Sequence, residues 1–401
     1  MSRHRSRAAA APAPGAPPPA ARPRVVISTY DGPASPHYRG GGAASMTLAA
    51  ACLAGDCEVT VVTAARRGGT ELRDGVRYRY LPVSRAGPRA GQLLFTALLP
   101  LAARRIPHDL WLESFTPPFS VSLLPLLARG RVAGVAQNLS GEEMSRRYHL
   151  PFWRIERFGL RFYHDVVVLS PADGQRVARC NPAAAVHVIP NCTEVPELAG
   201  QQPGSGEHIL WLGRVGVWEK GLDLLLSAYR QARPGLPLLL AGGGTRAEEG
   251  KLAALLGGGG QPAGAAAGAS APAGHVRWLG EVSGARKRAL LERSAFLVLP
   301  SRHEALGIAA LEGMARGKPV VHFDLPSLAW MAGDVRVAPF DITALARELG
   351  ALAADGDRRR ALGRAAYAAA VDYGPDRLAS RYRALVAGLL GVRARAGSGP
   401  A

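Results

Sequence analysis

Short apolar, β-branched runs alternate with longer stretches of helical periodicity from Arg24 onward, and this alternation constrains the fold more than any other feature. It is typical of parallel sheets whose strands are connected through helices. The pattern occurs twice, on either side of a Gly/Pro/Gln-rich segment at residues 197–207. A chain of 401 residues is also long enough for two cores. The sequence therefore predicts an α/β protein with two Rossmann-like, doubly wound domains facing each other across a cleft.

Each half supplies enough strands for one sheet. In the first half we expect strands at Arg24–Thr29, Glu58–Thr63, Val76–Leu81, Asp109–Glu113, Arg131–Gln137, Asp165–Leu169 and Val186–Ile189. In the second half we expect them at His208–Leu212, Leu236–Ala241, His275–Leu279, Ala295–Leu299, Pro319–His322 and Val335–Ala338. We predict an N-terminal domain at 24–196, a linker at 197–207, a second domain at 208–372, and a helix at 373–392 that packs back on the first domain. Disordered tails are predicted at 1–23 and 393–401.

The chain is strongly basic, with a net charge of +18, which raises the question of a nucleic acid or an anionic membrane as partner. Only four of the 49 basic residues are lysine, and Ala, Gly and Pro are abundant, so a GC-rich coding bias explains the charge better than a nucleic-acid-binding face. No apolar run reaches the ~18 residues of a membrane span. We expect a cytoplasmic protein without a nucleic-acid partner, and peripheral contact with the inner membrane face stays open.

The first loop of the second half carries two cations. In the segment HILWLGRVGVWEKG, Arg214 follows the strand and Lys220 lies at the start of the next helix. The positive end of a helix dipole repels a cation, so a lysine at this place indicates a bound anion. An ordinary solvated lysine is the alternative for Lys220 taken alone.

A later loop, in the segment LVLPSRHEALGIAALEG, indicates a second anion-binding element. We expect a helix that begins near Ala305, with the amides around Gly307 and Ile308 directed into the crevice. If this segment is fully helical, Glu304 and Glu312 lie ~12 Å apart along the axis. That distance is too long for a cooperating pair of catalytic carboxylates, so the two acids should have different roles.

Several motifs then follow one another in a specific order: GR…KG (Gly213, Arg214, Lys220, Gly221), LAGGG (Leu240–Gly244), EALGIAALE (Glu304–Glu312) and GMARGKPVV (Gly313–Val321). Their order and spacing resemble the donor half of retaining glycosyltransferases of family 4 (group 1), which have the GT-B fold. Upstream, VIPNCTEV at Val188–Val195 resembles the segment that closes the first domain of that family. The resemblance implies a glycosyltransferase that moves a sugar from a nucleoside diphosphate sugar to an unidentified acceptor with retention of anomeric configuration.

The resemblance also implies roles for individual residues. Arg214 and Lys220 would bind the donor diphosphate, Glu312 the ribose and Glu304 the transferred sugar. The predicted catalytic residues are Arg214, Lys220 and Glu304; the predicted donor-binding residues are Gly41, Gly42, Gly213, Gly243, Arg302, Gly307, Ile308 and Glu312; and the predicted acceptor-side residues are Arg39 and Glu113. The LAGGG motif lacks the acidic residue often found among those glycines, which leaves the nucleotide base open.

We expect neither a metal nor another cofactor, because two cations and a helix N-terminus can stabilise the charge on a departing diphosphate. The Asp355-Gly356-Asp357 sequence is predicted to be a turn or a helix cap. A nucleotide-sugar epimerase of the same fold and a non-catalytic sugar- or nucleotide-binding module are the alternatives. The acceptor is left open between a lipid-linked glycan, a polysaccharide and a specialised metabolite, and the apolar Gln92–Leu101 stretch favours one at a membrane.

Overall fold

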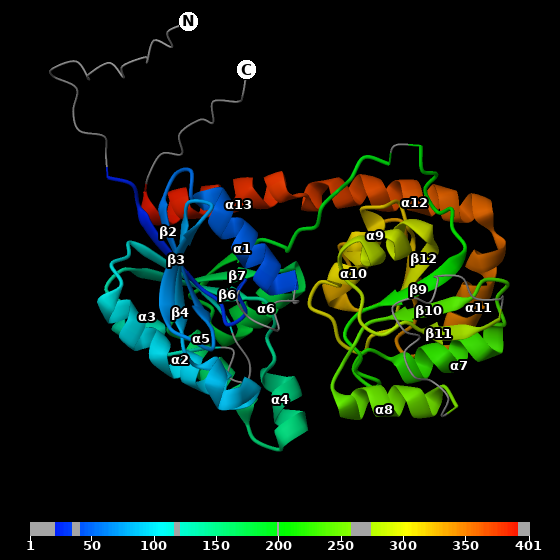
Figure 1. Ribbon diagram of the computed structural model, residues 1–401, viewed down its shortest axis with the longest axis horizontal. Helices are drawn as coiled ribbons and strands as arrows, with labels where there is room; N and C mark the ends of the chain where they lie inside the picture. Colours follow the sequence, from blue (N-terminus) through cyan, green and yellow to red (C-terminus); the bar gives the residue numbers. More distant parts are fainter. Residues whose placement is uncertain (1–20, 34–40, 116–120, 199, 258–273, 392–401) are drawn as a thin grey trace, which may run out of the picture.

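The computed structural model describes residues 21–33, 41–115, 121–198, 200–257 and 274–391. Figure 1 shows two α/β domains side by side, with the C-terminal helices α12 and α13 extending along one edge of both. Residues 1–20 of the predicted tail at 1–23, the predicted tail at 393–401 and the candidate residue Arg39 lie outside the described residues.

The sheet of the first domain has eight strands in the order β3-β4-β2-β1-β5-β6-β7-β8, all parallel except for the β3–β4 pair. The strands are β1 (Arg24–Ser28), β2 (Glu58–Ala64), β3 (Gly69–Arg73), β4 (Val76–Leu81), β5 (Leu110–Ser114), β6 (Arg131–Ala136), β7 (Asp165–Val168) and β8 (Ala185–Val188). The helices are α1 (Gly41–Leu53), η1 (Ser84–Ala86), α2 (Gly87–Arg105), α3 (Leu124–Leu127), α4 (Gly141–Tyr148), α5 (Phe152–Leu160) and α6 (Pro171–Cys180). The strand order reverses between β1 and β5, so a crevice forms at their carboxyl ends.

The second domain has a six-stranded, fully parallel sheet in the order β11-β10-β9-β12-β13-β14. Its strands are β9 (His208–Leu212), β10 (Leu238–Ala241), β11 (Val276–Trp278), β12 (Ser294–Leu299), β13 (Val320–Phe323) and β14 (Asp334–Val337). Its helices are α7 (Leu222–Ala232), α8 (Arg246–Leu255), α9 (Gly284–Arg293), α10 (Ile308–Met314), η2 (Pro326–Leu328) and α11 (Ile342–Ala354). Here the order reverses between β9 and β12, which brings the loops that follow these two strands together.

Strand β3 was not predicted. Its residues are half-exposed or exposed, so they show no apolar alternation. It forms because Asp74 and Gly75 both adopt positive φ, 51° and 77°, which allows the two-residue turn that joins antiparallel β3 to β4. The Asp-Gly dipeptide is the sequence signal that identifies this hairpin.

The end of the chain crosses back to the first domain through α12 (Gly356–Ala370), η3 (Val371–Tyr373) and α13 (Pro375–Leu390). Apolar side chains of α13, among them Leu378, Tyr382 and Val386, lie in the same buried cluster as Met46 of α1. The guanidinium of Arg131 donates to the carbonyl of Leu389 at 2.8 Å. The C-terminal helix α13 is therefore part of the core of the first domain. The chain crosses between the domains twice, once after β8 and once between α12 and α13.

Candidate functional site

Two loops of the second domain are joined where its strand order reverses. The loop at residues 213–221 follows β9, and the loop at 300–307 follows β12. The amide of Arg302 donates to the carbonyl of Glu219 at 3.0 Å. A side chain at Gly221, whose φ is 62°, would overlap the carbonyl oxygen of Pro300, so only glycine permits this approach. The two loops therefore pack directly against each other.

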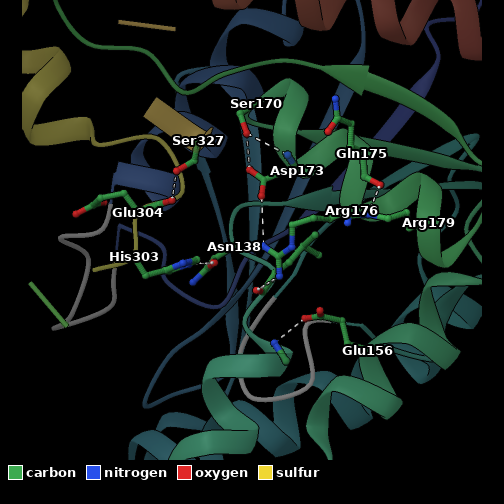
Figure 2. Close-up of polar contacts among 12 residues, drawn as sticks. Asn138, Glu156, Ser170, Asp173, Gln175, Arg176, Arg179, His303, Glu304 and Ser327 are labelled. Carbon is green, nitrogen blue, oxygen red and sulfur yellow. Dashed lines mark hydrogen bonds and ion pairs between the residues drawn. The ribbon is translucent and has the colours of Figure 1, made fainter. Parts of the chain in front are cut away.

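Lys220 and Glu304 connect the two loops through their side chains. The Nζ atom of Lys220 lies 2.6 Å from Oε1 of Glu304, and the two side chains are only 17% and 12% exposed. The hydroxyl of Ser301 donates to the same carboxylate oxygen at 2.7 Å. The backbone carbonyl of Glu304 accepts a hydrogen bond of 2.6 Å from Ser327, which Figure 2 shows. Lys220 is therefore held against the segment that leads into α10.

Helix α10 begins at Ile308, three residues later than the expected start at Ala305. Gly307 adopts φ 77° at the N-cap, a left-handed conformation that interrupts any helix through residues 304–307. Glu304 therefore lies in the loop before the helix, and the Glu304–Glu312 segment is helical only from Ile308 onward. The first turn of α10 has neither an acidic residue nor a side-chain cap, so its amides lack the usual capping acceptor among the described residues.

Arg214 lies on the same loop as Lys220 but is much more exposed, at 60%. Its Nη2 atom lies 3.0 Å and 3.1 Å from the two carboxylate oxygens of Glu219. Glu219 directly precedes Lys220, so the two predicted phosphate-binding cations lie in one neighbourhood. Glu219 was not predicted as a site residue, because a spacing of five residues from Arg214 does not indicate that the two side chains pair.

The predicted glycines of the β9 and β10 loops lie beside each other. The amide of Gly213 donates to Ala241, and the amide of Val215 donates to Gly243, at 3.1 Å and 2.9 Å. A side chain at Gly242 would overlap the carbonyl oxygen of Gly213. Although LAGGG contains no acid, the carboxylate of Glu249 on α8 accepts the amide of Gly244 at 2.9 Å.

Arg302 has partners within the protein. Its two terminal nitrogens donate to the carboxylate of Asp223 at 2.8 Å and 2.7 Å, and its guanidinium lies 5.2 Å from the ring centre of Trp218. Its side chain is 16% exposed. This bidentate arrangement makes Arg302 part of the framework that joins the two loops.

Glu312 lies one turn after Ile308 on α10 and forms an ion pair that the sequence did not indicate. The Nζ atom of Lys287, on α9, lies 2.6 Å from Oε1 of Glu312. Both residues line a cavity of about 390 Å³. The other side of this cavity is formed by Ser45 and Leu48 of α1 and by Cys192 and Thr193 of the segment that leaves the first domain. Glu312 therefore faces a space between the two domains.

Two contacts bring the domains together at the cleft. Gly41 opens α1, and a side chain there would overlap Cδ1 of Ile308 at the start of α10. His303 of the 300–307 loop lies 3.4 Å from the side-chain oxygen of Asn138 in the loop after β6, as Figure 2 shows. A Cβ atom at Gly42 would lie 2.8 Å from Oε1 of Gln137. The predicted glycines of the first domain thus lie opposite the predicted anion site of the second.

Glu113 ends β5 and is only 2% exposed. The hydroxyl of Tyr163, itself buried, donates to its carboxylate at 2.6 Å. Desolvation raises the pKa of Glu113 from 4.5 to about 7, although hydrogen bonds from Tyr163 and Ser122 act in the opposite direction. The structure therefore places this predicted acceptor-side residue inside the domain and beneath the crevice.

Two doubly wound domains that meet at a cleft, with Arg214 and Lys220 on one loop of the second domain, are typical of two-domain transferases. Comparison with known proteins identifies the family. Residues 38–195 match "Glycosyltransferase Family 4", and residues 206–355 match "Glycosyl transferases group 1". The chain belongs to this family. Solved structures with the same architecture include a sucrose-phosphate synthase of Thermosynechococcus elongatus, with a TM-score of 0.73 and 20% identity over 92% of this chain and 100% of that chain. The fold is GT-B.

Curated relatives are more similar in sequence but match over shorter segments. A GDP-mannose:cellobiosyl-diphosphopolyprenol alpha-mannosyltransferase of Xanthomonas oryzae is 30% identical over 215 residues, which cover 51% of this chain and 53% of that protein. A phosphatidyl-myo-inositol mannosyltransferase of Mycobacterium leprae is 30% identical over 172 residues, which cover 41% of each chain. The chain spans about half the length of these relatives or less.

Proposed function

We propose that this protein transfers a sugar from a nucleoside diphosphate sugar to an acceptor, with retention of anomeric configuration and without a bound metal. The observation that carries the proposal is the Lys220–Glu304 pair, which fixes an ammonium group between the β9 and β12 loops. Ligands of doubly wound sheets bind at this reversal of strand order. Retention is assigned from the family to which the chain belongs.

The structure supports a specific division of labour in this reaction. Cleavage of the anomeric C–O bond leaves negative charge on the departing diphosphate, and one cation at 4 Å interacts with a unit charge by about 4 kcal/mol at an effective dielectric of 20. Lys220 and Arg214 supply two cations on one loop, and Lys220 contacts Glu304 in the segment that leads into α10. Only the part of this interaction that grows in the transition state accelerates the reaction.

The two glutamates have different surroundings, which supports different roles. Glu304 lies in the loop beside Lys220, where its carboxylate can accept hydrogen bonds from hydroxyls of the transferred sugar. Glu312 faces the cavity between the domains, where it can accept hydrogen bonds from ribose hydroxyls. Each carboxylate has a lysine partner in the described chain, so each is held in place before a donor arrives.

The relatives suggest the first substrates to test. One is named for GDP-mannose and a diphosphopolyprenol-linked acceptor, and the other for phosphatidyl-myo-inositol. None of the helices in the described part of the chain has the length and apolar character that a membrane span requires. Exposed apolar side chains do occur on the first domain, with Leu93, Leu94 and Leu101 on α2 and Trp153 and Phe158 on α5. We therefore infer a lipid-linked acceptor reached at a membrane surface.

A donor screen without acceptor tests the proposal. The protein is incubated with GDP-mannose, GDP-glucose, UDP-glucose and UDP-N-acetylglucosamine, and release of nucleoside diphosphate is measured. We expect slow release from one donor, which Lys220→Ala abolishes. Conversion of one donor sugar into another without release would select an epimerase, and tight binding without either reaction would select a binding module.

A further inference from the structure

Three arginines surround an open cavity on the first domain, away from the donor loops. The cavity has a volume of about 530 Å³ and is lined by Arg66, Arg67, Ser84, Arg85 and Gly87. Arg66 and Arg67 follow β2, and Ser84 and Arg85 form the η1 turn after β4. Both segments lie at the carboxyl ends of parallel strands, the edge at which doubly wound sheets bind ligands.

The backbone holds these arginines in one place. The amide of Ala65 donates to the carbonyl of Leu81 at 2.8 Å, and the amide of Ser84 donates to the carbonyl of Ala65 at 3.1 Å. The side chain of Ser84 also forms a hydrogen bond with Tyr30, a residue of the loop after β1 that is only 9% exposed. Three loops of the sheet edge therefore fix the position of the cavity.

The charge of the cavity is uncompensated. Across the ranges of the chain that the structure describes, no ion pair or hydrogen bond is formed by the side chains of Arg66, Arg67 or Arg85. The 19-residue helix α2 begins at Gly87 in the cavity wall, with no acidic residue in its first turn and no side-chain cap. The three side chains are exposed, and like charges near a positive helix end repel one another, so a bound anion would relieve this repulsion.

We propose that this cavity binds a phosphate or diphosphate group of the acceptor. Guanidinium groups bind phosphate oxygens in bidentate geometry. A neutral sugar does not need three positive charges for its recognition, whereas a phosphate group does benefit from them. The inference rests on the proposed transferase function and names the chemical class of its second substrate. The donor diphosphate has its own cations, Arg214 and Lys220, on the other domain, so the arginine cavity is free for the acceptor.

The surface beside the cavity suits a phosphate that is attached to a lipid. Leu93 and Leu94 follow on α2, within two turns of its start, and are 41% and 45% exposed. In Figure 1 the first turns of α2 lie on the side of the first domain that is nearer the second domain. A phosphate in the cavity would therefore lie near exposed apolar side chains of α2.

Calorimetric titration with inorganic pyrophosphate tests the inference. A saturating concentration of GDP or UDP is added first, so that the donor site is filled and pyrophosphate reports on other sites. The test variant is Arg66→Gln/Arg67→Gln/Arg85→Gln. The control variant, Arg347→Gln/Arg364→Gln/Arg377→Gln, removes the same charge from exposed positions of α11, α12 and α13. We expect the test variant to bind pyrophosphate at least about tenfold more weakly, and the control to match the wild type.

A second arm distinguishes a discrete phosphate site from attraction to a charged bilayer. Sedimentation with vesicles of phosphatidylglycerol and phosphatidylcholine is measured with and without pyrophosphate. Equal pyrophosphate binding by the wild type and the test variant would overturn the inference. So would the finding that vesicle binding depends on the three arginines while calorimetry detects no pyrophosphate binding. Failure of the proposed function gives another result, because then no nucleoside diphosphate binds and Lys220→Ala changes nothing.

Discussion

Lys220 and Glu304 form an ion pair of 2.6 Å between two loops that are 84 residues apart in the chain. Neither side chain is more than 17% exposed, so the pair is shielded from solvent and the ammonium group has little freedom. When charge develops on a leaving group, a cation that is already in position can stabilise it with little energetic cost for reorganising the site. The ammonium group of Lys220 is therefore held in position, as the proposed metal-free transfer needs.

Lys220→Ala should lower turnover by at least ~100-fold while the protein stays folded, because removal of one positioned donor to a developing anion typically costs that much. Release of nucleoside diphosphate measures the effect, and circular dichroism checks the fold. Lys251→Ala is the matched control, because Lys251 also pairs with a glutamate but is 63% exposed on α8. A rate near that of the wild type would remove Lys220 from the mechanism.

The strands of both domains could be predicted because their central residues are buried apolar runs bounded by turn residues. Strand β9, for example, has the predicted bounds, and β12 begins only one residue earlier than expected. Edge strand β3 could not be predicted by the same reasoning, because its side chains are exposed and its pairing depends on one Asp-Gly turn. Apolar periodicity arises from buried side chains, so it cannot predict a strand whose side chains are exposed.

The sequence indicated Lys220, its partner Glu304 and Glu312, but not the lysine that pairs with Glu312. Lys287 lies in the basic segment ARKRALLER, and no sequence feature distinguishes it from the arginines around it. Only the folded structure shows that Lys287 of α9 reaches Glu312 of α10. The expected start of α10 was wrong for a related reason: Ala305 and Leu306 favour helix, whereas the left-handed conformation of Gly307 prevents it. Tertiary contacts decide both features.

The contact between Gly41 and Ile308 predicts a mutation that acts on the cleft itself. In Gly41→Ala the new methyl group would overlap Cδ1 of Ile308 and crowd its Cγ1 and Cγ2 atoms, so the Ile308 side chain or the approach of the two domains must shift. We expect turnover to fall about tenfold or more, since a misplacement of 1 Å can cost more than that. The second substitution Ile308→Ala should restore part of the activity by making room.

Gly55→Ala is the control for the intrinsic effect of replacing glycine near α1, because no atom lies within 4 Å of a side chain at that position. Equal losses in Gly41→Ala and in the double variant would show that the overlap with Ile308 is not the cause.

Glu312→Ala should weaken the binding of nucleoside diphosphate by ~10- to 100-fold, because a hydrogen bond to a charged group typically contributes 1.5–3 kcal/mol. Calorimetry with the nucleotide released in the donor screen measures this loss. Glu348→Ala is a suitable control, because Glu348 is 19% exposed, also has a cationic partner at 2.9 Å, and lies on α11. Unchanged affinity in Glu312→Ala would contradict the ribose assignment.

If Arg214 and Lys220 supply the charge that a divalent ion provides in other transferases, as we propose, chelation by EDTA should leave turnover unchanged. The Asp-x-Asp sequence has a structural role: the side chain of Asp355 accepts the amide of Arg358 at 2.8 Å and caps α12. The assay is nucleotide release before and after dialysis against the chelator. Loss of activity that magnesium restores would show that a metal takes part.

The buried carboxyl of Glu113 predicts how stability depends on pH. Its pKa is about 7 in the folded protein, against an ordinary value of 4.5, so the folded state binds more protons than the unfolded state between these two values. The free energy of unfolding therefore decreases as the pH rises from 4.5 to 7, by an amount on the order of 3 kcal/mol for this one group. Below pH 4.5 the carboxyl is protonated in both states and contributes no slope.

Glu113→Gln removes this dependence, because the amide never ionises and its oxygen can still accept the hydroxyl of Tyr163 at the position of the carboxylate. Urea unfolding at pH 5 and pH 8 should therefore show a larger gain for the variant over the wild type at pH 8. Glu142→Gln, at an exposed position of α4, should show no such difference. A gain that is the same at both pH values would mean that Glu113 ionises in the folded protein as readily as in the unfolded chain, and that burial does not control its proton.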